Sequence, residues 1–201
     1  MLLVRRVRGA VLTVLLCVLA SACGAGDAGG PVPETTTGAP PSGSVELPPR
    51  PREIRLDGVD PCALLTERQR AELGLDARPL LSRAPVGLYE GAEVPLCTIG
   101  GFEPRAVTVG LSLVTNVGIE RFTSGELAAE IRPITVAGFP AVVAVPTRLT
   151  DYCTVIVDAA SGQLLDVQFA TGGRQPPIPQ PQLCRDAETV AGEVMTTLLD
   201  R

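Results

Sequence analysis

Six cysteines are the residues with the clearest chemical capacity in this chain of 201 residues. The last four, Cys62, Cys97, Cys153 and Cys184, are separated by 35, 56 and 31 residues. An even number of cysteines outside the reducing cytoplasm predicts disulfides, here two. A zinc site built from all four is the alternative, but structural zinc sites usually contain close Cys-x-x-Cys pairs, which this spacing lacks. We therefore predict two disulfides and no bound metal.

Two close pairs of carboxylates are the other candidates for chemistry. Glu90 with Glu93, and Asp57 with Asp60, are close enough in sequence for acid–base or metal work, as paired carboxylates perform in glycosidases. Both pairs lie in connecting segments rich in Pro and Gly, where solvated or helix-capping acids are common. We therefore favour a structural role for these acids over a catalytic one.

Several catalytic classes are excluded by residue types that the sequence lacks. It contains no His, Lys or Trp, so every basic residue is Arg. Without His there is no Ser-His-Asp or Cys-His catalysis and no imidazole metal ligand. Without Lys there is no Schiff-base or P-loop chemistry, and Ser112 and Ser124 have no evident general base. We predict no catalytic residue and no cofactor, so the protein is not expected to be an enzyme.

The N-terminal segment predicts where the chain works. Three arginines, the last of them Arg8, precede an apolar run over residues 9–22 that is too short to span a bilayer. Small residues then lead to Cys23, so residues 1–22 are a predicted signal peptide. The segment Leu19-Ala20-Ser21-Ala22-Cys23 resembles a bacterial lipoprotein lipobox, which implies that Cys23 becomes the acylated first residue. The expected location is the extracytoplasmic face of the cell membrane, with the acyl anchor as membrane contact.

A segment of low complexity follows the predicted anchor. Residues 23–53 are rich in Gly, Pro, Thr and Ser and have too few apolar side chains to offset the entropy of ordering, which predicts a disordered tether. A bare spacer is favoured over a glycosylated stalk. Removing residues 1–22 leaves 14 basic against 22 acidic residues, a net charge of −8. This charge argues against a nucleic-acid partner and against binding to anionic lipid through a basic patch.

Residues 54–201 have the length and apolar content of one globular domain. Asp60 with Pro61 predicts a capped first turn, and Thr66 with Gln69 predicts a capping box for a short helix that ends at Gly74. This helix is expected to bury Leu64, Leu65, Ala71 and Leu73. Residues 76–93 contain several Pro and Gly residues and predict an irregular excursion with at most one short strand.

Strand patterns dominate the middle of the domain. Residues 94–99 and 106–115 predict two strands, and residues 153–158 and 164–170 a hairpin around Gly162. Alternation places apolar residues of these strands on one face, while Asp166 and Gln168 are expected to face outward. Residues 120–130 predict a weak helix, and residues 131–145 a β-branched segment interrupted at 138–140.

The last helix is expected from about Leu183, with an apolar stripe suited to cover a half-polar sheet. The prolines at 176–181 precede it, and we favour chain routing over polyproline docking for this loop. The whole pattern predicts an α+β domain, with a roughly five-stranded antiparallel sheet packed by N-terminal and C-terminal helices and cross-linked by two disulfides.

Four cysteines allow three disulfide pairings. Cys153 begins one strand of the predicted hairpin, and the chain leaves the same end of that hairpin to reach Cys184. We therefore favour Cys153 with Cys184, which leaves Cys62 for Cys97. The rival pairing joins Cys62 to Cys184 and Cys97 to Cys153, and it requires the strands of Cys97 and Cys153 to be adjacent.

The order of these features resembles the actinobacterial lipoproteins built around a domain of unknown function. The resemblance covers residues 60–199 and consists of the lipobox, the tether, Pro-Cys-x-Leu-Leu-Thr at 61–66, Cys97 in a strand, Val-x-Gly-x-Pro-Ala at 136–141, Cys153 before a Val-rich strand and Cys184 opening the last helix. The family often has Trp two places after the second cysteine, where this chain has Ile99. The resemblance implies fold and location but no activity.

Three functional classes follow from these observations. The first is a non-catalytic envelope lipoprotein that binds another envelope protein or acts as an accessory or sensor module. The second is a carrier of an apolar envelope ligand in a cavity between sheet and helices, and the third is an enzyme that works without His. The missing residue types rank them in this order.

Overall fold

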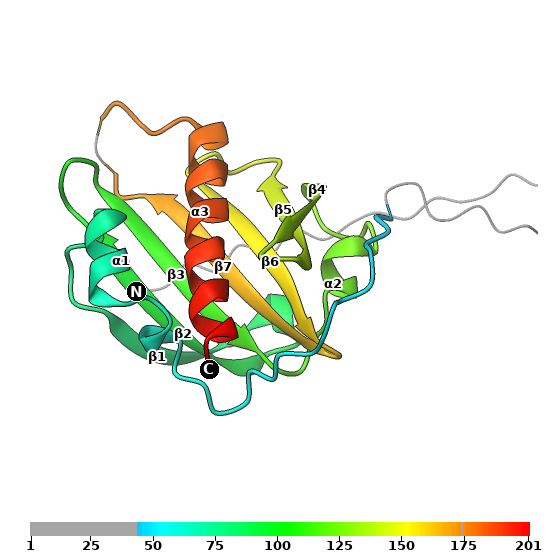
Figure 1. Ribbon diagram of the computed structural model, residues 1–201. Helices are drawn as coiled ribbons and strands as arrows, with labels where there is room; N and C mark the ends of the chain where they lie inside the picture. Colours follow the sequence, from blue (N-terminus) through cyan, green and yellow to red (C-terminus); the bar gives the residue numbers. More distant parts are fainter. Residues whose placement is uncertain (1–43, 174) are drawn as a thin grey trace, which may run out of the picture. The chain divides into compact units, whose positions relative to one another are not determined.

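The computed structural model describes residues 44–173 and 175–201, which belong to one compact unit (Figure 1). The predicted signal peptide, Cys23 and residues 24–43 of the tether lie outside these ranges. Within the described ranges, no helix combines the length and the apolar character needed to cross a membrane.

Seven antiparallel strands form the sheet, in the order β1-β2-β3-β7-β6-β5-β4. The strands are β1 Leu80–Val86, β2 Ala92–Gly101, β3 Val107–Val114, β4 Ala129–Val136, β5 Phe139–Pro146, β6 Tyr152–Ala160 and β7 Gln163–Thr171. The helices are α1 Glu67–Glu72, α2 Glu120–Thr123 and α3 Gln180–Leu199, with short 3-10 turns η1 Pro61–Ala63 and η2 Gly87–Tyr89. The predicted α+β class is confirmed, and the predicted strand number of about five is wrong.

The two additional strands are the edges of the sheet. β1 occupies part of the segment expected to be irregular, and nearly all its residues are exposed, so it shows no alternation of apolar and polar residues. β4 begins at Ala129, inside the stretch predicted as a helix, but most of it lies in the predicted β-branched segment 131–145, whose interruption is a turn that separates β4 from β5. Pro133 is tolerated because an edge strand has one unpaired side. The helix in that stretch, α2, has only four residues.

The sheet consists of two meanders that meet at the β3–β7 pair. β1, β2 and β3 are consecutive neighbours, as are β4, β5, β6 and β7, and the connection through α2 carries the chain from β3 to the far edge. Val109 pairs with Phe169 and Leu111 with Val167, so the apolar rows of β3 and β7 lie on the same side.

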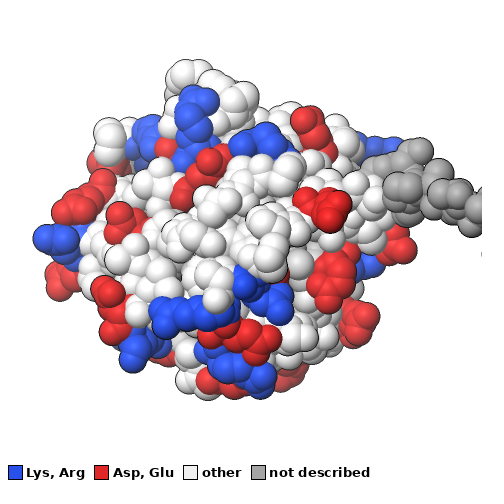
Figure 2. Space-filling view, turned by 45° about the vertical axis from the view of Figure 1, so that its right-hand side comes forward, with Lys and Arg blue, Asp and Glu red and all other residues white. Residues whose placement is uncertain are grey.

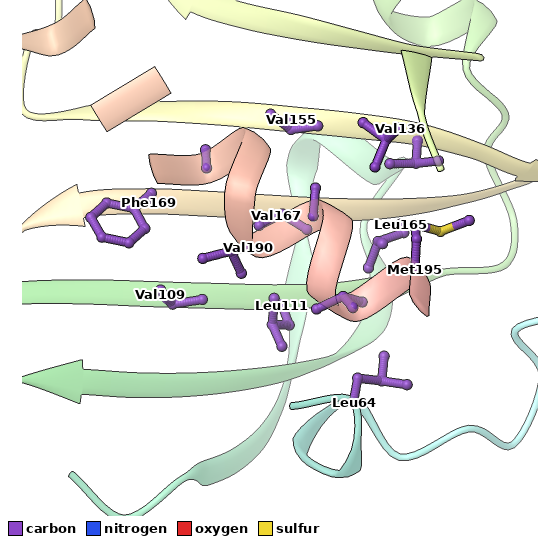
Figure 3. Close-up of a cluster of buried hydrophobic side chains, with 14 of the residues drawn as sticks. Leu64, Val109, Leu111, Val136, Val155, Leu165, Val167, Phe169, Val190 and Met195 are labelled. Atoms are coloured by element: carbon purple, nitrogen blue, oxygen red, sulfur yellow. The ribbon is translucent and has the colours of Figure 1, made fainter. Parts of the chain in front are cut away.

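α3 covers this apolar side, which we call the helix side (Figure 1). Figure 3 shows Val190 and Met195 of α3 close to Val109, Leu111, Leu165, Val167 and Phe169 of the sheet. All seven side chains are at most 1% exposed. α3 begins three residues before the predicted Leu183, because proline is compatible with the first turn of a helix, where its missing N–H costs no hydrogen bond.

The N-terminal turns follow their capping residues. The Asp60 side chain accepts a hydrogen bond from the Cys62 N–H at 2.9 Å, and Thr66 with Gln69 forms the predicted capping box. Leu64 and Leu65 are buried as expected, whereas Ala71 is exposed, because α1 is only six residues long and turns its Gln69 side inward.

The two disulfides follow the sequential pairing. Cys62 is bonded to Cys97 with 5.1 Å between the Cα atoms, and Cys153 to Cys184 with 4.9 Å. The rival pairing would join β2 to β6, but β3 and β7 lie between them, a separation of roughly 14 Å at the usual strand spacing. Both bonds belong to the helix side, where Cys97, Cys153 and Cys184 are part of the core.

Residues 44–53 lie against the domain, whereas the sequence predicted a free tether up to residue 53. The Val45 N–H donates to the Thr123 carbonyl at 2.9 Å, and Leu47 packs on the second apolar cluster. Arg50 Nη1 donates to both carboxylate oxygens of Asp158, at 2.6 and 2.7 Å. The folded part of the chain therefore begins before residue 54.

Candidate functional site

The side of the sheet opposite α3 has a different composition, and we call it the pocket side. Its strand centres carry Thr108, Ser112, Thr154, Asp166 and Gln168, which alternate with the core residues of β3, β6 and β7. A smaller apolar cluster covers only part of this side, built on Tyr89, Val114, Phe122, Val142, Ile156 and Leu164. The elements that cover it are short, namely η2, α2 and residues 44–53.

A pocket of about 220 Å³ opens on this side, between the α2 segment and strands β5, β6 and β7. Its apolar lining consists of Leu88, Phe122, Leu127, Ala128, Ala129, Ala144 and Pro146. Its polar lining consists of Tyr152, Thr154, Asp166 and Gln168. The pocket therefore has apolar walls and a small number of polar groups, the composition expected of a small-molecule site.

Asp166 is the chemically unusual member of the lining. The Tyr89 hydroxyl donates a hydrogen bond to Asp166 Oδ2, whereas Asp166 Oδ1 is buried and has no hydrogen-bond partner. Burial raises the pKa of Asp166 to about 6, although the bond from Tyr89 acts in the opposite direction. The pKa of Tyr89 is also raised, first by burial and then by the adjacent carboxylate, so Tyr89 remains a donor at neutral pH.

The reversal between β1 and β2 places Tyr89. Glu90 and Gly91 both adopt left-handed backbone angles, with φ of 57° and 73°, which turns the chain directly after η2. The Asn116 side chain donates to the Tyr89 carbonyl at 3.1 Å, and the Tyr89 ring packs on Phe122 with 6.4 Å between ring centroids. Tyr89 is 1% exposed, so these contacts hold its hydroxyl at Asp166.

Residues 18–197 match a family model described as a protein of unknown function, DUF3558. The chain belongs to the DUF3558 family. No curated protein and no solved structure matches it.

One of the two predicted carboxylate pairs of this DUF3558 chain, Asp57 with Asp60, has structural partners. Asp57 accepts hydrogen bonds from Gln163 Nε2 at 2.8 Å and Arg55 Nε at 3.1 Å; the bond from Gln163 is the main cause of its lowered pKa. The Asp60 side chain caps η1, whereas Glu90 ends η2 only through its backbone N–H, which donates to the Gly87 carbonyl, and Glu93 is exposed on β2. Asp57, Asp60 and Glu93 line one open hollow of about 350 Å³, but the described residues contain no acidic, Cys or His cluster suited to a metal.

The remaining candidates are separated from one another in the DUF3558 domain. Ser112 is next to Asp166 across the β3–β7 pair, whereas Ser124 ends α2 with a buried hydroxyl that has no partner. The prolines at 176–179 line a surface groove of about 470 Å³ with residues 104–106 and lead directly into α3.

On the face shown in Figure 2, acidic and arginine side chains interleave around an uncharged area.

Sequence reasoning missed Asp166, which alternation assigned to the solvent. Alternation correctly placed it opposite Leu165 and Val167, but that side of the sheet is partly covered as well. The available signal was the run Leu164-Leu165-Asp166-Val167. Asp is unfavourable in strands, and apolar neighbours on both sides of it indicate a strand that is buried on both faces.

Proposed function

We propose that this chain is a non-catalytic, lipid-anchored protein of the cell envelope whose folded domain recognises an envelope partner, as a binding or accessory module. The support for the anchor is the predicted signal peptide and the residues before Cys23, together with the resemblance to actinobacterial lipoproteins. The two disulfides fit an oxidising compartment. The acyl chains on Cys23 would then hold the domain at the extracytoplasmic face of the membrane.

The observation that carries the binding role is the pocket around Asp166. A buried carboxylate oxygen without a partner costs stability, and here it belongs to a residue in the lining of a pocket whose walls are mostly apolar. Sites at which a fold tolerates such a cost are expected to be functional ones. The helix side contrasts with this, because its side chains fill the space between α3 and the sheet.

A carrier of an apolar ligand is the second candidate, favoured by the apolar walls formed by Leu88, Phe122 and Leu127. The sequence suggested a cavity between the sheet and the helices for this ligand, and the present pocket lies between the α2 segment and strands β5, β6 and β7. Its volume of about 220 Å³ is below the roughly 300–1,000 Å³ typical of drug-sized ligands. This size favours recognition of one small group over enclosure of a lipid.

The non-catalytic assignment rests on the geometry of the carboxylates. A glycosidase-type mechanism needs two carboxyl groups on opposite sides of one bond. Asp166 instead accepts a hydrogen bond from the phenol of Tyr89. Asp57 accepts one from the Gln163 side chain, and Asp60 accepts one from the Cys62 N–H at the start of η1. These acids therefore act within the fold or as single binding groups.

The proposed function is tested on the full chain in its own cells. Mass spectrometry of the membrane fraction should find Cys23 as an acylated N-terminus, and Cys23→Ala should remain an unacylated precursor. Affinity capture of the acylated chain should then retain an envelope protein, and Asp166→Asn should retain less of it. A secreted wild-type chain without acyl mass would contradict the anchor, and equal capture by wild type and Asp166→Asn would contradict the assigned side of the domain.

A further inference from the structure

The pocket has room for a ligand group and not only for solvent. A cavity holds one water when it offers about 10–15 Å³ to a water-sized probe, and this pocket offers about 220 Å³. Leu88, Phe122 and Leu127 exclude water from part of its wall, and Asp166 is among the lining residues, with a buried Oδ1 that has no hydrogen-bond partner. The complementary ligand therefore has an apolar stem and a hydrogen-bond donor at its end.

The donor should carry a positive charge. Hydrogen bonds from a cation to a carboxylate are roughly twice as strong as neutral ones, and the attraction increases in a site shielded from water. Asp166 supplies the negative charge, and Thr154 and Gln168 line the same pocket with further acceptor oxygens. The oxygens of these residues are of the type that accepts hydrogen bonds from an ammonium group.

The geometry favours an ammonium over a guanidinium. A guanidinium binds a carboxylate best through two parallel hydrogen bonds, one to each oxygen. Asp166 Oδ2 already accepts the bond from Tyr89 and Oδ1 is buried, so the carboxylate does not offer two oxygens side by side to one ligand. An ammonium is a compact charge that needs a single acceptor oxygen from the carboxylate, and it fits this arrangement.

We infer that the pocket binds a primary ammonium group on a short alkyl stem, with the ammonium paired to the Asp166 carboxylate. This inference rests on the proposed function and specifies the chemistry that the partner presents. The group has two sources, a free alkylamine or a lysine side chain of the partner. A second copy of this chain cannot supply it, because the sequence contains no Lys.

The ionisation of Asp166 makes binding depend on pH. The pKa of Asp166 is raised to about 6, so the carboxyl loses its charge as the pH falls below that value. The titratable groups near it are the phenols of Tyr89 and Tyr152, whose pKa values are both raised and which stay neutral from pH 5 to 8. Burial is the main cause of the raised pKa of Tyr152, and the charge of Asp151, which is outside the pocket lining, adds to it. Binding should therefore weaken between pH 7.5 and pH 5 while the amine remains protonated.

The test measures pentylamine and 1-pentanol against the full acylated chain in phosphatidylcholine nanodiscs, by saturation-transfer-difference NMR at pH 7.5. Wild type should bind pentylamine at least tenfold more tightly than 1-pentanol, and Asp166→Asn should lose this preference. Asp151→Asn, which removes a charge outside the lining, should keep it. Equal affinity for the two ligands in wild type, or the same preference in Asp166→Asn, would overturn the inference.

A second variant covers the case in which Asp166→Asn does not fold. Ala128 is exposed at the pocket wall, so Ala128→Phe should fold, narrow the pocket and weaken pentylamine binding at least tenfold. Unchanged binding to Ala128→Phe would also overturn the inference. Nα-acetyl-lysine N-methylamide identifies the source: binding that depends on Asp166 indicates a lysine side chain, and binding of pentylamine alone indicates a free amine.

The two proposals fail separately. A chain without acyl mass on Cys23 would contradict the proposed function, and its preference for pentylamine would then be measured in solution without nanodiscs. An acylated chain that shows no preference for pentylamine would contradict this inference alone.

Discussion

The two sides of the sheet differ in the elements that cover them. On the helix side a 20-residue helix and two disulfides enclose Val, Leu, Met and Phe side chains that are almost fully buried. On the pocket side a four-residue helix, a 3-10 turn and residues 44–53 cover part of the sheet and leave Asp166 in the pocket lining. The difference indicates that stability is concentrated on the helix side, and the recognition site that we propose lies on the pocket side.

Neighbouring residues of β7 provide the largest expected contrast. Phe169 is 1% exposed on the helix side, and its replacement by Ala should reduce the free energy of unfolding by about 3–5 kcal/mol. Gln168 is exposed on the other side of the sheet, and Gln168→Ala should change the free energy of unfolding by no more than about 0.5 kcal/mol. Urea unfolding with intact disulfides measures both variants, and similar losses would remove the distinction between the two sides.

The disulfide between β6 and α3 should contribute the next largest effect. It closes a separation of 31 residues, for which the chain-entropy account gives about 3–4 kcal/mol. The double replacement Cys153→Ala and Cys184→Ala should therefore lower the unfolding free energy by that amount while Cys62–Cys97 remains intact. A loss below about 1 kcal/mol would show that α3 is held by packing alone.

Asp166 should make the stability of the pocket side depend on pH. Its folded pKa of about 6 lies above the ordinary value of 3.8, so between these values the folded chain binds the proton more tightly than the unfolded chain. The unfolding free energy of wild type should therefore fall as the pH rises through this window, by about 2–3 kcal/mol relative to Asp166→Asn. Thermal unfolding at pH 4 and pH 7.5 measures this change, and a constant difference between the two proteins would contradict it.

Arg50 tests whether residues 44–53 belong to the pocket side. Its partner Asp158 has a side chain that is 8% exposed, and Arg50→Ala would leave that carboxylate unpaired. Burial is the main cause of the raised pKa of Asp158, and Arg50 opposes it. We expect Arg50→Ala to cost about 1–2 kcal/mol at pH 7.5, less than a fully buried pair because Arg50 is partly exposed. Arg55→Ala, which breaks an exposed pair, should have no measurable effect, and an equal result for both variants would contradict the role of Arg50.

The helix side was predictable because its residues repeat with a regular period. The alternation from Val107 to Leu113 identified β3 and its buried face, and Thr66 with Gln69 identified the start of α1. Alternation of apolar and polar residues did not identify β1, because an edge strand that is exposed on both faces shows no such alternation. The order of the strands, with β3 beside β7, depends on contacts between distant residues that no local pattern records.

The pocket was not predictable because its residues come from separate elements. Tyr89 lies in a turn that the sequence indicated only as irregular, and Asp166 lies 77 residues later in β7. The hydrogen bond between them and the unpaired Oδ1 exist only after the two meanders meet. Arg50 was assigned to a tether for a similar reason, because its partner Asp158 lies 108 residues further along the chain.

The titration of Asp166 tests the account of the pocket side most directly. The carboxyl carbon signal of Asp166, assigned by its loss in Asp166→Asn, should be followed by NMR from pH 3 to pH 8 with and without pentylamine. The account predicts a midpoint of about 6 without ligand and a lower midpoint with pentylamine, because the ammonium stabilises the charged carboxylate. A midpoint near the ordinary value of 3.8, unchanged by the amine, would contradict both the buried carboxylate and its role in recognition.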